Sequence, residues 1–398
     1  MNDLKKDLNF FVDLVRLFLE EEKKQPITKV IPPKEVDQRL NIRLNKNETK
    51  EEEFQEILKK LILNSPKSAS KLFYNQLYGG RQSKALIGDF LSALLNNSMA
   101  TYKIAGPQVN IEKEVLDNII SLTDFGKQAA GTFPTGGSMS NFMSLIMARD
   151  KFSSNSITKG VEKDLIIYSS ENSHYSISKN VSFCGVGKDN IRYVGSNNKG
   201  QIDVQLLKSQ IKKDIKKGLK PFYLNATAGT TVLCAFDPIE QLIPICKKYN
   251  IWLHIDGAFG GVAIFSKKYS KLLKGVNQAD SFCFNAHKTL GAPLSTSVLI
   301  VKNKKYLHRS FNNEASYLYQ THDNDYNLGQ TSFECGRRNN ALKLWTLWKS
   351  VGTNGIAKMV EKNYHLANTA RNYVKNNSDY TLYSYDNSLS ICFNYKNF

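Results

Sequence analysis

The spacing of hydrophobic and polar residues divides the chain into two parts near residue 110. In the first part, residues 1–24 and 51–65 place apolar side chains on one face of a helix, so we expect two amphipathic helices there. Adjacent prolines at positions 32 and 33 cannot continue a helix and indicate an extended connector between the two.

Beyond residue 110, short apolar runs alternate with segments of helical spacing. The runs that predict strands are 164–170, 191–195, 221–229, 251–259, 281–287 and 296–302. Helices are predicted between several of them, and Asp237 followed by Pro238 is a typical helix start before residues 238–250. This alternation predicts an α/β fold with a largely parallel sheet covered by helices on both faces. In such sheets, ligands bind beyond the carboxyl ends of the strands.

Length and composition limit the class of protein. With 398 residues, the chain can form one large domain and one or two smaller ones. It has no run of about 18 apolar residues, so we expect no membrane span. The six cysteines are scattered without a C-x-x-C pair, which argues against a zinc site and a disulfide framework and favours a reducing cytoplasm.

The chain carries 54 lysines and arginines against 36 aspartates and glutamates, a formal net charge of +18. Such an excess is compatible with nucleic-acid binding. However, the basic residues form no single stripe, and aromatic residues are not interleaved with them as in RNA-binding proteins. We therefore interpret the charge as solvated helix faces and expect no nucleic-acid partner.

Two features that could bind a ligand lie at a predicted helix start and after a predicted strand. In "FPTGGSMSN", two glycines precede a helix that carries Ser138 in its first turn, and the exposed N–H groups there can bind a phosphate. An ordinary capped helix after a tight turn explains the same residues. His174 follows the predicted strand 164–170. It is either an ordinary surface histidine or a flat ring that stacks on an aromatic ligand.

Two charged residues lie in apolar surroundings. Asp256 belongs to the strand 251–259, and a buried carboxylate needs a cationic partner, either a basic side chain or a ligand nitrogen. Lys288 is the single lysine of residues 280–301 and follows the strand 281–287. Burial lowers the pKa of a lysine and makes its neutral amine nucleophilic toward a carbonyl. The alternative is a buried stem whose ammonium group reaches water.

One ligand satisfies all four features. Pyridoxal 5'-phosphate has a phosphate, a protonatable ring nitrogen, a flat ring face and an aldehyde, which match a helix start, an acid, a stacking group and a lysine. A dinucleotide is a poorer match, because no predicted strand is followed by G-x-G-x-x-G.

At these residues the chain resembles the group II pyridoxal-phosphate decarboxylases, most closely the glutamate and cysteine-sulfinate decarboxylases. The resemblance covers about residues 70–398 and includes "PTGGSMSN", "SENSHYSI", "WLHIDGAFGG", "NAHK" and "ECGRRNNALKLWTLWKSVG". It implies the aspartate-aminotransferase-like fold (fold type I) and a homodimer. The implied domains are an N-terminal helical dimerisation segment at 1–100, a large cofactor-binding domain at 101–340 and an incomplete α+β small domain at 341–398.

The resemblance also implies roles for the matching residues. Lys288 would bind the cofactor aldehyde, Asp256 would hold the protonated ring nitrogen, and His174 would stack on the ring. Tyr317, on a mobile loop, would return a proton to the α-carbon of the substrate. Further contacts would come from Gly137, Ser138, Thr231, Ala258, Asn285 and His287 to the cofactor, and from Asn75 and Gln76 to the substrate.

The implied reaction is decarboxylation of an L-amino acid to its amine, with glutamate as the first candidate. Aspartate, cysteine sulfinate, diaminobutyrate and aliphatic amino acids stay open as alternatives. The chain ends before a late arginine that helps hold the substrate carboxylate in the relatives. Either Arg337 or Arg338 would then replace that arginine, or the protein is a truncated, catalytically impaired homologue that binds the cofactor.

Overall fold

The computed structural model describes residues 2–74, 77–312, 315, 317–319 and 324–396. The chain divides into two compact units, Met1–Asn75 and Gln76–Phe398. The predicted domain boundaries at residues 100 and 340 stay predictions.

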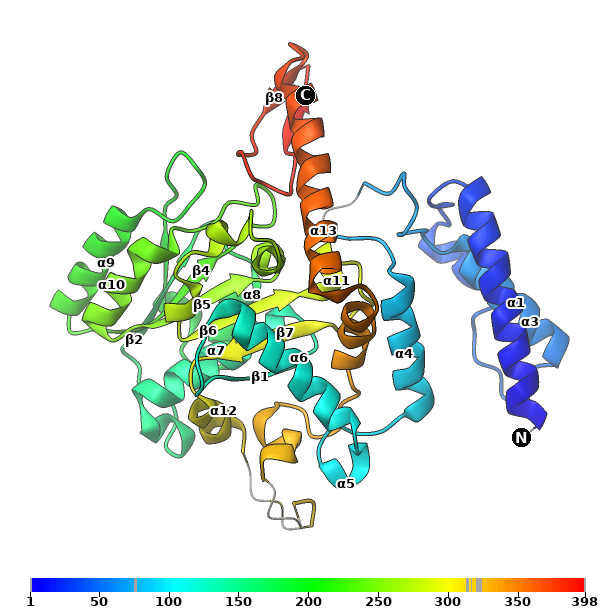
Figure 1. Cartoon of the computed structure of the whole chain (residues 1–398), viewed down its shortest axis with the longest axis horizontal. Coiled ribbons are helices and arrows are strands. Elements are labelled where there is room, and N and C mark those ends of the chain that lie inside the picture. The colour runs from blue at the N-terminus through cyan, green and yellow to red at the C-terminus, as the bar shows by residue number, and fades with distance from the viewer. Residues whose placement is uncertain (1, 75–76, 313–314, 316, 320–323, 397–398) are drawn as a thin grey trace. The chain divides into compact units, whose positions relative to one another are not determined.

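The first unit is helical, as its apolar spacing predicts. Its long helices α1 (Asn2–Lys24) and α3 (Glu51–Asn64) pack against each other (Figure 1). The predicted break at the two prolines is the start of a short 3-10 helix, η1 (Pro33–Glu35), which is followed by α2 (Val36–Leu40).

The second unit is built on a seven-stranded sheet with the strand order β1-β7-β6-β5-β4-β2-β3. The strands are β1 (Ala130–Thr132), β2 (Leu165–Ser170), β3 (Ile191–Val194), β4 (Lys220–Thr227), β5 (Trp252–Gly257), β6 (Ser281–Asn285) and β7 (Ser297–Val301). The five strands from β3 to β6 run parallel, whereas β7 is antiparallel to both β6 and β1. The largely parallel sheet is therefore confirmed, with β1 as an additional strand that the sequence did not predict.

Helices cover both faces of this sheet and enclose two separate cores (Figure 1). On one face lie α7 (Gly137–Phe152), α8 (Ser176–Phe183) and α12 (Lys304–Phe311). The other face is covered by α6 (Gln108–Thr123), α9 (Val204–Lys216), α10 (Ile239–Tyr249) and α13 (Ala341–Lys375). Alternate residues of β5 point to opposite faces, so Trp252 packs in the first core while Leu253 and Ile255 pack in the second.

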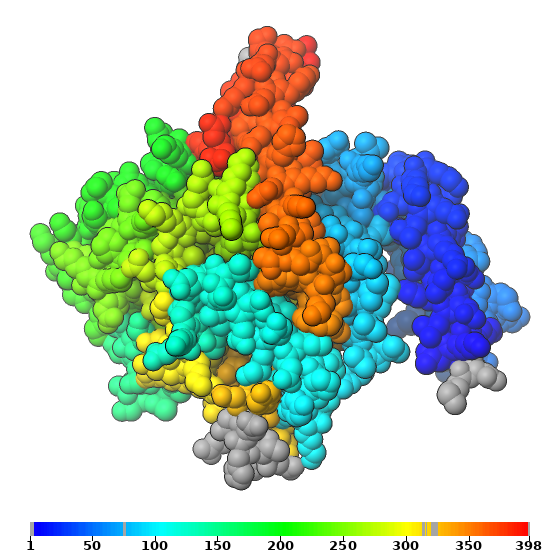
Figure 2. All heavy atoms as spheres, viewed as in Figure 1, coloured from blue at the N-terminus to red at the C-terminus, as the bar shows by residue number. Residues whose placement is uncertain are grey.

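The remaining elements lie around this framework. Helix α4 (Ser83–Leu95) packs along α13, whose helical geometry is interrupted at Gly352. Helices α5 (Tyr102–Ala105) and α11 (Ala286–Thr289) are single turns. The end of α13 and the two-stranded sheet of β8 (Tyr380–Leu382) and β9 (Phe393–Tyr395) project from the body of the second unit (Figure 2). No helix in the described part of the chain is long and apolar enough to cross a membrane.

Asp237, predicted to cap a helix, has a different role in the structure. Helix α10 begins at Ile239, and Asp237 does not cap it. The Asp237 carboxylate instead accepts hydrogen bonds from the backbone N–H groups of Ile202 and Thr227, both at 2.7 Å. Asp237 therefore joins the end of β4 to a segment that precedes α9.

Candidate active site

A cavity of about 430 Å³ lies at the carboxyl ends of β4, β5 and β6, beside the first turn of α7. All nine residues predicted to contact the cofactor line it: Gly137, Ser138, His174, Thr231, Asp256, Ala258, Asn285, His287 and Lys288. Its lining also contains polar residues that the sequence interpretation did not select, among them Thr135, Asn141, Tyr175 and Thr227.

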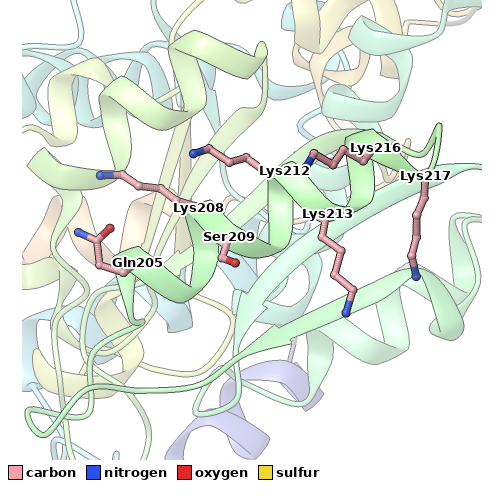
Figure 3. Close-up of a pocket in the computed structure, with 7 residues that line it drawn as sticks. All are labelled: Gln205, Lys208, Ser209, Lys212, Lys213, Lys216 and Lys217. Atoms are coloured by element: carbon pink, nitrogen blue, oxygen red, sulfur yellow. The ribbon is translucent and has the colours of Figure 1, made fainter.

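A second hollow has different chemistry. It lies on the outer face of α9 and is lined by residues of that helix and its end: Gln205, Lys208, Ser209, Lys212, Lys213, Lys216 and Lys217 (Figure 3). The residues that line it include no acid and no strand end, so it does not compete with the cavity at the strand ends as a catalytic site.

One end of the cavity is suited to an anion. Helix α7 starts at Gly137, and the N–H groups of a first helical turn have no partner within the helix. A Cβ atom added to Gly137 would lie 3.1 Å from both the Ala258 Cβ and the Asn285 Nδ2 atoms, so the glycine keeps this end open. Ser297 donates to the Asn285 Oδ1 atom at 2.7 Å, which leaves the Nδ2 group as a donor on the side of Gly137.

Asp256, at the end of β5, has only neutral partners. Its Oδ2 atom accepts a hydrogen bond from Asn141 Nδ2 at 2.8 Å, and its Oδ1 atom accepts one from the backbone N–H of Ala258 at 3.1 Å. The side chain is only 3% exposed, yet no described basic residue forms an ion pair with it. A cationic ligand nitrogen is therefore the partner that this carboxylate lacks.

Lys288 lies in α11, directly after β6. Burial lowers the pKa of its amine, and the nearby Asp256 carboxylate offsets this effect only in part. Within the described residues the amine has no hydrogen bond or ion pair that would hold it as an ammonium ion. The neighbouring His287 adds no charge, because burial lowers its pKa to about 4 and its Nδ1 atom accepts from Thr296 N at 3.1 Å.

His174 is held as a neutral ring at the edge of the cavity. Its Nδ1 atom accepts the backbone N–H of Ser176 at 3.2 Å and lies 2.8 Å from the Ser176 hydroxyl oxygen. Burial lowers the pKa of the imidazole; the Asp256 carboxylate opposes this effect and Lys288 adds to it. A flat, uncharged ring in this place can stack on an aromatic ligand.

Of the other predicted residues, Tyr317 and Arg337 can be placed, and neither lines the cavity. Tyr317 is 80% exposed and is not among the residues that line the cavity. Asn75 and Gln76 lie outside the described residues. Arg337, considered above as a replacement for the late arginine, is buried and forms two 2.7 Å hydrogen bonds with Glu112, so it is not free to bind a substrate carboxylate.

The cavity fits pyridoxal phosphate. It offers N–H donors for a phosphate, an amine for an aldehyde, and an acid without a cationic partner for a ring nitrogen. In addition, the hydroxyl oxygen of Thr227 is buried at the cavity and has no hydrogen-bond partner among the described residues, so a polar ligand atom can satisfy it.

Comparisons with known proteins agree with this chemistry. Residues 33–396 match the family model of the pyridoxal-dependent decarboxylase conserved domain. Human acidic amino acid decarboxylase GADL1 is 33% identical over 405 residues, which cover 99% of this chain and 78% of that protein. Human cysteine sulfinic acid decarboxylase is 33% identical over 367 residues, which cover 91% of this chain and 74% of that protein.

A solved structure extends the match to three dimensions. The crystal structure of mouse CSAD in its apo form aligns with a TM-score of 0.93 and 29% identity, over 98% of this chain and 84% of that one. The chain therefore belongs to the pyridoxal-dependent decarboxylase family, with its type I fold, and is a pyridoxal-phosphate-dependent amino-acid decarboxylase.

Proposed function

We propose that the substrate is a small acidic L-amino acid, with glutamate as the first to be tested and aspartate and cysteine sulfinate next. The observation that carries the proposed site is that Lys288, Asp256 and His174 meet the α7 start at one cavity. The acidic substrate class is supported by the names of two relatives, the acidic amino acid decarboxylase and the cysteine sulfinic acid decarboxylase.

We assign each cofactor contact to a residue of the cavity. Pyridoxal 5'-phosphate supplies an aldehyde that condenses with amines and a ring that accepts electrons when CO₂ leaves. The neutral amine of Lys288 would be the group that holds the aldehyde. Asp256 would hold the ring nitrogen in its protonated form, and His174 and Ala258 would pack against the ring. The phosphate or the ring edge would be held by Gly137, Ser138, Thr231, Asn285 and His287.

The reaction consumes one proton. Cleavage of the Cα–carboxylate bond releases CO₂ and leaves the electron pair on the substrate side, so the α-carbon must gain a proton to give the amine. We assign this proton to the Tyr317 hydroxyl, which regains one from solvent. Because Tyr317 does not line the cavity of its own chain, we propose a homodimer in which it serves the cavity of the second copy.

The first experiment tests the cofactor lysine and the substrate together. Protein mixed with pyridoxal 5'-phosphate is expected to show a visible absorbance band and to release CO₂ from glutamate, aspartate or cysteine sulfinate. Lys288→Ala is expected to lose both, whereas Lys212→Ala, on the outer face of α9, is expected to keep both. A cofactor band without CO₂ from a full panel of amino acids would reject the catalytic proposal and favour the impaired homologue.

The second experiment tests the homodimer. Lys288→Ala and Tyr317→Phe proteins are each expected to be nearly inactive. If subunits exchange at random, half of the dimers combine the two variants and hold one intact site, so mixing is expected to restore about a quarter of the wild-type activity. No recovery under conditions where exchange is demonstrated would place the Tyr317 hydroxyl in its own subunit's site or outside catalysis.

A further inference from the structure

A buried chain of hydrogen bonds ends at Asp256. It links Trp252, Ser281, His254, Asn141 and Asp256, each at most 3% exposed. The Trp252 indole N–H donates to the Ser281 hydroxyl at 2.9 Å, and this hydroxyl lies 2.8 Å from His254 Nδ1. The His254 Nε2 atom lies 3.0 Å from Asn141 Oδ1, and Asn141 Nδ2 lies 2.8 Å from the Asp256 carboxylate.

The chemistry of Trp252 and Asp256, at the two ends, fixes which atom donates and which accepts in each of these hydrogen bonds. An indole N–H can only donate, so Trp252 occupies a lone pair of Ser281 and leaves the serine hydrogen free to point at His254 Nδ1. An ionised carboxylate can only accept, so Asp256 requires the NH₂ side of the Asn141 amide. The amide oxygen then faces His254 Nε2, which must carry the ring hydrogen. Burial lowers the pKa of His254 to about 4, which keeps the ring neutral and limits it to one such hydrogen.

Asn141 also connects Asp256 with the stacking histidine. Its NH₂ group has two hydrogens, and the second partner is the Ser176 hydroxyl oxygen at 3.1 Å. That hydroxyl is in turn 2.8 Å from His174 Nδ1. One amide orientation therefore satisfies the carboxylate and the serine that holds the His174 ring.

We propose that Asn141 and His254 are positioning residues, in which the Nε2–H tautomer of His254 fixes the Asn141 amide so that it donates to Asp256 and aims the carboxylate at the cofactor ring nitrogen. This rests on the role proposed above for Asp256. Without the His254 donor, the Asn141 oxygen keeps only a weak 3.8 Å hydrogen bond from the Cys283 thiol, so the amide can turn over. Its oxygen would then face the carboxylate, and Asp256 would lose a hydrogen bond to a charged acceptor.

The test measures the affinity of apoprotein for two probes. One is pyridoxal 5'-phosphate, and the other is its 1-deaza analogue, in which carbon replaces the ring nitrogen. His254→Leu is expected to weaken pyridoxal-phosphate binding about tenfold, the usual effect of losing a hydrogen bond to a charged group, and to leave binding of the analogue unchanged. His254→Gln keeps an N–H donor near the Nε2 position and is expected to bind both probes like the wild type.

Ser281→Ala is the milder variant. It removes one hydroxyl from the far side of His254 and is expected to weaken pyridoxal-phosphate binding selectively, by about threefold. If His254→Leu does not fold, it will also fail to bind the analogue. Ser281→Ala then tests the positioning role in its place. Equal losses for the two probes, or no loss for pyridoxal phosphate, would overturn the positioning role.

Asp256→Ala separates this inference from the proposed function. A selective loss of pyridoxal-phosphate binding in Asp256→Ala, with none in His254→Leu and Ser281→Ala, rejects the positioning role alone. Equal weakening of both probes in Asp256→Ala rejects the proposed contact between Asp256 and the ring nitrogen, and the inference with it.

Discussion

Gly79 lies outside the cavity, and replacing it with alanine should disturb the turn that carries Lys288. A Cβ atom at position 79 would lie 2.1 Å from the Lys288 carbonyl oxygen, 2.8 Å from Gly291 N and 2.9 Å from the Thr289 carbonyl oxygen. All three obstacles are backbone atoms, so no side-chain rotation can relieve the overlap. The two segments are also joined by a 3.0 Å hydrogen bond from Gln82 N to the Gly291 carbonyl oxygen.

The overlap sets the size of the effect. Ordinary contact begins at 3.4 Å, so the segment around Gly79 or the Lys288 turn must move by about 1.3 Å. Overpacking usually costs about 1–3 kcal/mol, and rigid neighbours put Gly79→Ala at about 3 kcal/mol. The φ angle of Gly79 is not positive, so the backbone itself accepts alanine and the cost comes from the contact.

Thermal unfolding and the visible band of the bound cofactor measure the two consequences. Gly79→Ala is expected to unfold at a lower temperature and to form less of the Lys288-dependent band at a given cofactor concentration. Gly336→Ala is the matched control, because its Cβ would meet nothing within 4 Å and its φ angle is not positive either. Equal unfolding temperatures and bands for the two variants would refute the close approach of the two segments.

Three further predictions concern a buried ion pair, a buried histidine and a glycine of the cavity lining. Arg337→Ala leaves Glu112 as a buried charge without its partner and should lower the free energy of unfolding in denaturant by about 3–5 kcal/mol, whereas replacing both residues with leucine should cost less. Burial lowers the pKa of His254 from an ordinary 6.5 to about 4. The contribution of the neutral ring to stability is therefore complete above pH 6.5 and is lost as the pH falls toward 4. His254→Gln should reduce the difference between the free energies of unfolding at pH 7 and pH 4 by about 3 kcal/mol. Gly137→Ala should weaken cofactor binding in a titration and lower the unfolding temperature of the apoprotein only slightly, because its Cβ would lie 3.1 Å from Ala258 and Asn285 atoms. A lower unfolding temperature with normal binding would contradict this.

The sequence was informative where burial on both faces of the sheet leaves an apolar run. All six predicted strands occur in the sheet, and the adjacent parallel strands β5 and β6 bring Asp256 and Lys288 to one cavity. Strand β1 could not be found in this way, because three residues with a glycine in the middle carry no periodicity. Asp237 looked like a helix cap because local residues allow it, but its carboxylate binds Ile202, which lies 35 residues away in sequence.

Asn141 shows a different limit. It belongs to "GGSMSN", which drew attention for its glycines and serine, and a polar residue in the second turn of a helix has no obvious meaning by itself. Its partners Asp256 and His254 lie 115 and 113 residues away. A signal was nevertheless present, because Trp252, His254 and Asp256 alternate along one strand and must share a face. These three side chains carry polar groups on the same buried face of the sheet. They therefore require hydrogen-bond partners from the element that packs over that face.

The hydrogen bonds of Asp256 also explain why Asp256 and Lys288 can contact opposite ends of one ligand. A carboxylate and an amine at the ends of neighbouring strands would ordinarily pair, and pairing would keep the amine protonated and unreactive. Instead, Asn141 and the Ala258 N–H bind the carboxylate without neutralising it, so it still gains from a cation. The effect of burial on the Lys288 pKa outweighs the attraction of Asp256, so the amine is biased toward its neutral form. Uncharged donors around the acid are therefore as necessary to the proposed chemistry as the acid and the lysine themselves.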